Sequence, residues 1–108
     1  MYDCVYKGAH EMKAIERILA AMKNHKLELC NEYPIKQIGV FGSYLRGEER
    51  SNSDVDVLVE FEHPIDLFRF LDLEEKLSEL FGKRVDLVSK KALKPHIGRQ
   101  ILKEVRYL

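Results

Sequence analysis

The chain has 108 residues, the usual size of one small domain, so we expect no second lobe that could hold a large substrate. Hydrophobic residues make up 45% of the chain and charged residues 33%, a balance that excludes the compositions of disordered and membrane proteins. The 18 basic residues balance the 18 acidic residues, which argues against a protein whose main role is to wrap nucleic-acid phosphates.

The sequence also shows no membrane or secretion signal and no cysteine spacing typical of a disulfide framework or a zinc site. No apolar run approaches the roughly 20 residues of a membrane-spanning helix, and the start lacks the pattern of a secretion signal, so we expect a cytoplasmic protein with no membrane contact. The two cysteines, Cys4 and Cys30, are too few for a disulfide framework and lack the paired spacing of a zinc site. Neither cysteine is expected to have a functional role.

The N-terminal part of the chain predicts a tail followed by a packing helix. Residues 1–11 show no periodicity, so we expect a tail ahead of a single domain of residues 12–108. A helix is predicted over residues 11–23, a break at Asn24 and His25, and a shorter helical piece that ends before Pro34. The apolar stripe that predicts the first helix consists of Met12, Ile15, Leu19 and Met22.

Two apolar strands follow, and a polar loop joins them. Residues 36–41 predict a buried strand that runs into Gly42 and Ser43, and residues 54–61 predict a second strand. Because side chains alternate along a strand, two aspartates of the second strand share one face with Leu58. These aspartates are Asp54 and Asp56, and the opposite face carries Val55, Val57, Val59 and Phe61.

The remaining elements are a helix, a third strand and a last helix. Asp66 predicts the N-cap of the helix and Gly82 its C-terminal end. Residues 84–88 predict a strand in which Asp86 faces away from its apolar neighbours, and Pro95 precedes an amphipathic helix. The order is helix, strand, strand, helix, strand, helix, which indicates an α/β (α+β) domain with a small β-sheet flanked by helices.

Three aspartates form the candidate metal site. Two carboxylates on one strand face and a third in the next strand are costly to bury without a compensating charge. Mg²⁺ prefers a few carboxylate oxygens and leaves its other positions to water and phosphates. Asp54, Asp56 and Asp86 are therefore the predicted ligands of Mg²⁺ beside a nucleotide, where metal ions assist displacement at phosphorus.

The turn at Gly42 and Ser43 is the candidate phosphate site. Glycine lets the backbone approach a phosphate closely, and Ser43 offers a hydroxyl beside backbone N–H groups at the start of a short helix. Arg46, one turn later, is a further candidate for phosphate contact, with simple solvation at the surface as the alternative.

These residues allow two other interpretations. The spacing from Gly42 to Gly47 suggests a P-loop, but Glu48 and Glu49 stand where that motif needs a lysine and a hydroxyl residue, so the P-loop is excluded. The aspartates could also be ordinary ion-pair partners of the nearby arginines Arg46, Arg50 and Arg84.

The segments "GVFGSYLRGEERSNSDVDVLVEF" and "RVDLV" resemble the minimal nucleotidyltransferases of the polymerase-β-like superfamily, the MNT or MntA-type antitoxins. The resemblance runs from about Ile15 to the C-terminus. It implies a mixed sheet with helices mainly on one side. By this resemblance Gly42 and Ser43 hold the ATP phosphates, Asp54 and Asp56 bind Mg²⁺, and Asp86 completes the triad.

The function expected from motif and resemblance is transfer of AMP from ATP to a hydroxyl of a protein. Asp86 is the candidate group that orients or deprotonates this hydroxyl. A nucleic-acid substrate is not expected, because a neutral single domain is poorly suited to a long strand. The alternative function is a non-catalytic, nucleotide-binding antitoxin that masks its partner sterically. Modification of a small molecule is a third option, which normally requires an additional substrate domain.

The C-terminal residues 89–108 indicate a partner surface. They hold six basic residues against Glu104 alone, a formal local charge of +5 in an otherwise balanced chain. A solvated helix face is the simpler interpretation. The last helix, however, has more apolar residues than one buried stripe requires. The resemblance implies a HEPN ribonuclease toxin as partner, modified on a hydroxyl, with tyrosine preferred.

Overall fold

The computed structural model describes residues 14–50 and 52–108. The predicted tail, the predicted start of the first helix and Met12 lie outside these residues. The described elements are α1 (Ala14–Glu32), β2 (Ile35–Phe41), α2 (Ser43–Arg46), β3 (Val55–Phe61), α3 (Leu67–Phe81), β4 (Val85–Ser89), the 3₁₀ turn η2 (Lys90–Ala92), α4 (Pro95–Glu104) and β5 (Arg106–Tyr107).

One mixed sheet organises the described part of the chain. Its strand order is β4-β3-β2-β5. The central strand β2 runs antiparallel to both β3 and β5, whereas β3 and β4 are parallel and are connected through α3. The mixed sheet with flanking helices confirms the predicted fold class.

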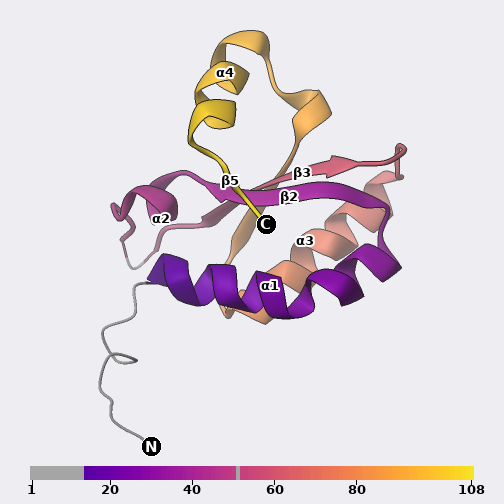
Figure 1. Cartoon of the computed structure of the whole chain (residues 1–108), viewed down its shortest axis with the longest axis horizontal. Helices are drawn as coiled ribbons and strands as arrows, with labels where there is room; N and C mark the ends of the chain where they lie inside the picture. The colour runs from indigo at the N-terminus through magenta and orange to yellow at the C-terminus, as the bar shows by residue number, and fades with distance from the viewer. Residues whose placement is uncertain (1–13, 51) are drawn as a thin grey trace, which may run out of the picture.

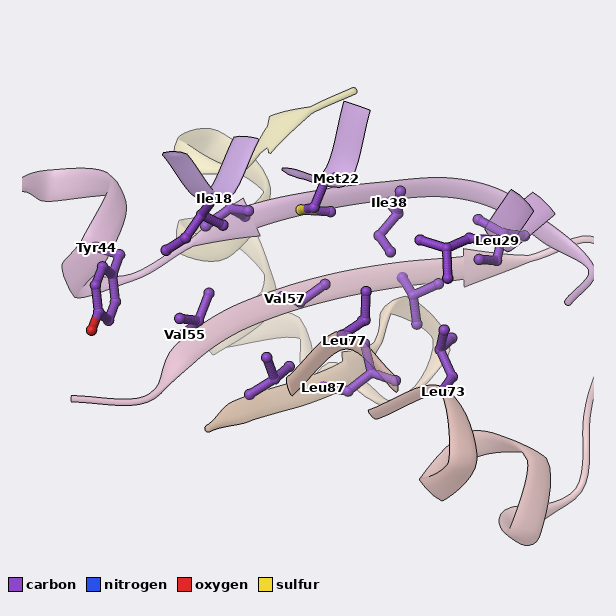
Figure 2. Close-up of a cluster of buried hydrophobic side chains, with 14 of the residues drawn as sticks. Ile18, Met22, Leu29, Ile38, Tyr44, Val55, Val57, Leu73, Leu77 and Leu87 are labelled. Atoms are coloured by element: carbon purple, nitrogen blue, oxygen red, sulfur yellow. The ribbon is translucent and has the colours of Figure 1, made fainter. Parts of the chain in front are cut away.

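The two faces of the sheet differ in what covers them. Helices α1 and α3 pack side by side beneath one face, while α4 stands on the other side (Figure 1). The apolar core lies between the sheet and helices α1 and α3. Here Ile18 and Met22 of α1 meet Val57 of β3 and Leu77 of α3 (Figure 2). None of the described helices is long and apolar enough to cross a membrane.

Helix α1 corrects one prediction. It is continuous over Ala14–Glu32, so the predicted break at Asn24 and His25 is wrong. The buried stripe of α1 extends past these two residues to Leu29, which is 1% exposed, because both polar residues fall on the outer face. The buried positions along the whole helix are Ile15, Ile18, Met22 and Leu29.

Helix α3 begins and ends as the sequence predicts. The side chain of Asp66 accepts a hydrogen bond from the backbone N–H of Arg69 at 2.8 Å, which satisfies one of the free donors of the first turn. Gly82 ends the helix in the left-handed conformation, with φ of 66°. These two signals fix the position of the crossover that places β4 beside β3.

The strand β5 was not predicted from the sequence. It pairs with β2 through Gly39 and Tyr107, and the N–H of Leu108 donates to the carbonyl of Ile38 at 3.1 Å. A Cβ on Gly39 would lie 2.7 Å from the carbonyl oxygen of Arg106, so only glycine allows this close approach. A two-residue strand is too short to produce an alternating pattern, which is why the sequence did not reveal it.

Candidate active site

The turn that follows β2 lies directly against Asp56. Gly42 has φ of 84°, and a Cβ at this position would lie 2.1 Å from Oδ2 of Asp56. A side chain here is therefore excluded both by the backbone conformation and by contact with the carboxylate. Ser43 is the first residue of α2 and is partly exposed. The two halves of the sequence motif thus meet in space.

The carboxylates lie at neighbouring positions of adjacent strands. Asp56 of β3 is the register partner of Asp86 of β4, and Asp54 immediately precedes β3. Asp56 is partly buried, while Asp86 is exposed and faces away from the buried residues that flank it, as the sequence predicted. Asp54 pairs with Arg84, whose Nε lies 3.5 Å from Oδ1 in an exposed ion pair.

The ion pair of Asp54 agrees in part with the alternative that the aspartates are partners of nearby arginines. Asp54 has an arginine partner, as that alternative supposed. The Arg84 side chain is 81% exposed, and such surface pairs contribute little stability. Among the ion pairs of the described residues, none involves Asp56 or Asp86, so the alternative leaves the central carboxylate unexplained.

Partial burial and neighbouring negative charges both act on Asp56. Burial, followed by the negative charges of Asp86 and Asp54, raises the pKa of Asp56 to about 6, and the positive charge of Arg46 offsets only part of this. A partly buried carboxylate beside two further carboxylates favours a bound cation.

The donor set fits Mg²⁺ in chemistry, because every predicted ligand is a carboxylate oxygen. In the described residues, however, no three acidic, histidine or cysteine side chains are already gathered as a metal site. Asp54 is paired with Arg84 in this arrangement. The metal ligands therefore remain a prediction.

Arg46 is engaged by two glutamates. Its Nε donates to Glu48 Oε1 at 3.0 Å, and its Nη1 donates to both carboxylate oxygens of Glu104 at 2.9 and 3.0 Å. Glu104 also accepts a hydrogen bond from the backbone N–H of Gly42 at 3.0 Å. One carboxylate from the end of α4 therefore contacts two of the three predicted phosphate-binding residues, Gly42 and Arg46.

Comparisons with known proteins agree with this arrangement. The family model described as nucleotidyltransferase domain matches residues 22–108. The chain belongs to the nucleotidyltransferase family. It is 47% identical over 97 residues to the protein adenylyltransferase MntA of Thermococcus cleftensis, a match that covers 90% of this chain and 98% of that protein. It is 43% identical over 98 residues to a proposed protein adenylyltransferase of Methanocaldococcus jannaschii, with coverage of 90% and 100%.

Solved structures place this nucleotidyltransferase among the minimal members of the family. A structure described as a proposed minimal nucleotidyltransferase superposes with a TM-score of 0.74 at 38% identity, over 90% of this chain and 97% of that chain. A toxin–antitoxin complex with AMP-PNP has a TM-score of 0.64 at 24% identity, over 85% of this chain and 69% of that chain. The second likeness is one of fold.

A cleft of about 550 Å³ in the nucleotidyltransferase connects the turn with α4. Its wall on the side of the sheet includes Gly42, Arg46 and Asp56. The sequence indicates a partner surface for the last helix and assigns none of the residues that α4 contributes here to the site, because they lie about 40 residues beyond the last aspartate of the motif pair and match no motif. These residues are Ile97, Gln100, Ile101, Lys103 and Glu104.

Proposed function

We propose that this protein transfers AMP from ATP to a hydroxyl group of another protein. One observation carries the proposal: 47% identity, over nearly the whole of both chains, to a protein named for protein adenylyltransferase activity. The close approach of Gly42 to Asp56 supports it, because a phosphate-binding turn and a metal ligand must be neighbours for this reaction. Mg²⁺ is the proposed cofactor.

The proposed nucleotide site comprises Gly42, Ser43 and Arg46. The backbone N–H of Gly42 and the guanidinium of Arg46 are donors of the kind that phosphate oxygens accept. Both already hold an anionic group, the carboxylate of Glu104, which supports their assignment to phosphate. A fold neighbour of this chain was solved with AMP-PNP.

The proposed reaction uses Asp54, Asp56 and Asp86. These carboxylates would hold Mg²⁺, which supplies positive charge against the charge that develops on the phosphates. The acceptor oxygen forms a bond to the α-phosphorus, the bond from the α-phosphorus to the bridging oxygen breaks, and pyrophosphate leaves. Asp86 is exposed on β4, where we propose that its carboxylate orients the acceptor hydroxyl and takes its proton.

The proposed partner is a HEPN ribonuclease toxin, for which this chain is the antitoxin. One fold neighbour is described as a tri-AMPylated HEPN toxin of Shewanella oneidensis in complex with an MNT antitoxin, with a TM-score of 0.61 at 24% identity, over 84% of this chain and 70% of that chain. On this chain, Ile97 and Leu102 of α4 are 58% and 42% exposed, which supports a protein contact there. Tyrosine is the proposed acceptor residue, since an added phosphate beside a ribonuclease site would repel RNA.

The test is the intact mass of the partner toxin after co-expression with this chain. We expect a gain of whole AMP units, and no gain with the Asp54→Asn/Asp56→Asn variant. The matched control is Glu75→Gln/Glu79→Gln, which also removes two negative charges, from exposed positions of α3 on the other face of the sheet. The control is expected to modify the toxin as the unaltered chain does.

The alternative function makes the opposite prediction. An antitoxin that only masks its partner neutralises the toxin equally well with and without Asp54 and Asp56, and the mass of the toxin stays constant. That result would overturn the proposed transfer.

A further inference from the structure

The side chain of Glu104 occupies the place where the proposed function needs a phosphate. Its carboxylate accepts from the N–H of Gly42 at 3.0 Å and from Arg46 Nη1 at 2.9 and 3.0 Å. A carboxylate and a phosphate accept hydrogen bonds from the same donors, and guanidinium groups bind both with similar geometry. An internal anion and the nucleotide therefore need the same two groups.

The position of Glu104 in the fold makes this contact specific. Glu104 is the last residue of α4, 62 residues along the chain from Gly42, and its side chain is only 29% exposed. The preceding α4 residues and the turn line the two sides of one cleft. By contrast, Glu48 lies two residues from Arg46, its side chain is 65% exposed, and its carboxylate accepts a hydrogen bond from Arg46 Nε at 3.0 Å. Proximity to Arg46 alone therefore does not explain the contact of Glu104 with the turn.

We propose that Glu104 is an internal competitor of the nucleotide phosphates and thereby sets the affinity of the protein for ATP. In the nucleotide-free protein the carboxylate holds Gly42 and Arg46 in place. A phosphate group of the incoming nucleotide takes over these donors, and the Glu104 side chain moves into the open cleft. The inference rests on the proposed function for its ligand, and it adds an affinity-determining residue that the sequence motif does not contain.

The expected effect of removing Glu104 on the affinity for ATP is opposite to that of an ordinary binding-site residue. Loss of Glu104 should tighten binding, because nucleotide no longer has to displace a charged acceptor from Arg46. Glu104→Ala frees both donors, whereas Glu104→Gln keeps an oxygen that can accept from Gly42 but loses the charge. We expect the dissociation constant of ATP to fall by about tenfold in the alanine variant and by less in the glutamine variant.

The experiment is calorimetric titration of ATP and of inorganic triphosphate into the full chain, each with Mg²⁺ and with EDTA. Triphosphate isolates the contacts to phosphate. Tightening in the presence of EDTA shows that the effect does not depend on metal. The matched control is Glu48→Gln, which removes a negative charge beside Arg46 without freeing Gly42. It is expected to change the dissociation constants by less than twofold.

A second measurement follows the turn itself. In a ¹⁵N–¹H spectrum without ligand, the Gly42 amide should shift in Glu104→Ala and stay in place in Glu48→Gln. In the unaltered chain, triphosphate should move the same amide. If Glu104 only stabilised the fold, its loss would instead lower the melting temperature without tightening the binding of ATP or triphosphate.

The outcomes separate the two proposals. If the unaltered chain binds ATP and the Glu104 variants bind it equally or more weakly, Glu104 is no competitor, and the proposed function stands. If neither the unaltered chain nor any folded variant binds ATP or triphosphate, both proposals are overturned. Binding that tightens in the order unaltered chain, Glu104→Gln, Glu104→Ala supports the inference.

Discussion

At the scale of single residues, the site depends on one close contact between two segments of the motif. Gly42 has the backbone conformation and the absence of a side chain that allow Asp56 to lie against the turn. Asp56 in turn is held among other negative charges. Both residues therefore carry a cost in stability that their function would explain.

Substitution of Gly42 tests this contact. Gly42→Ala should lower the free energy of unfolding by about 2 kcal/mol, through strain at positive φ and overlap with Asp56, and should abolish nucleotide binding. The measurements are urea denaturation and calorimetry with ATP. Gly47→Ala is the matched control, because Gly47 has a similar φ of 73° but a Cβ there would meet nothing within 4 Å. An equal loss of stability in both variants would show that the overlap with Asp56 is unimportant.

Asp56 gives the protein a pH-dependent stability. Its pKa is raised from an ordinary 3.8 to about 6, so the folded state holds this proton more tightly than the unfolded state. The resulting stabilisation is full below the unfolded pKa and is lost as the pH rises through 6. Asp56→Asn should therefore be more stable than the unaltered chain at pH 7, by about 1 kcal/mol after solvent screening.

The measurement for Asp56 is urea denaturation of the metal-free chain at pH 4 and pH 7. The variant and the unaltered chain should differ more at pH 7 than at pH 4. A difference that is the same at both pH values would show that the charge of Asp56 is not the cause.

At the scale of elements, α4 and β5 complete the site from the opposite end of the chain. The pairing of β5 with β2 fixes the end of α4, and this places Glu104 over the turn. Gly39 permits the pairing, because any side chain there would meet the backbone of β5. A residue of the central strand β2 therefore influences the cleft.

Substitution of Gly39 tests this coupling. Gly39→Ala should displace β5, since a Cβ would lie 2.7 Å from the Arg106 carbonyl oxygen. Hydrogen exchange at the Leu108 amide, which bonds to Ile38, should accelerate by at least tenfold. The Gly82 amide, which bonds to Ser78 at the end of α3, is the internal reference and should keep its rate. Unchanged exchange at Leu108 would mean that the sheet tolerates the methyl group.

At the scale of the whole molecule, the two faces of the sheet have different roles. Helices α1 and α3 cover one face and form the core with it, whereas the other face carries the candidate site and α4 (Figure 1). Within α4, Gly98 is the one buried residue, and the helix exposes apolar side chains instead. This division separates the residues that stabilise the fold from those available to a partner.

The proposed partner surface can be tested by charge substitution. Ile97→Asp and Leu102→Asp should weaken toxin binding by at least tenfold, because each places a charge in an apolar contact. Leu27→Asp on α1 is the matched control, since Leu27 is 76% exposed on the other side of the sheet. Co-purification and calorimetry provide the measurements. Toxin binding that is lost in Leu27→Asp and retained in both α4 variants would place the interface on α1.

The sequence alone determined the order of the main elements and the residues of the motif. Hydrophobic alternation located β3 and put Asp56 on the face opposite Val55 and Val57, and the capping signals of Asp66 and Gly82 set the limits of α3. These features are local, because periodicity and caps depend on residues a few positions apart. The predicted break in α1 was wrong, because packing of the helix on the core overrode the weak local signals at Asn24 and His25.

Only the tertiary structure decided which distant residues meet. The overlap that excludes a side chain at Gly42 arises because β2 and β3 are neighbours in the sheet, and the pairing of β5 with β2 depends on Gly39. The contact of Glu104 with the turn joins residues 62 positions apart and matches no spacing rule. Such contacts follow from the packing of α4 and β5 against the sheet, a property of the folded chain that no local pattern encodes.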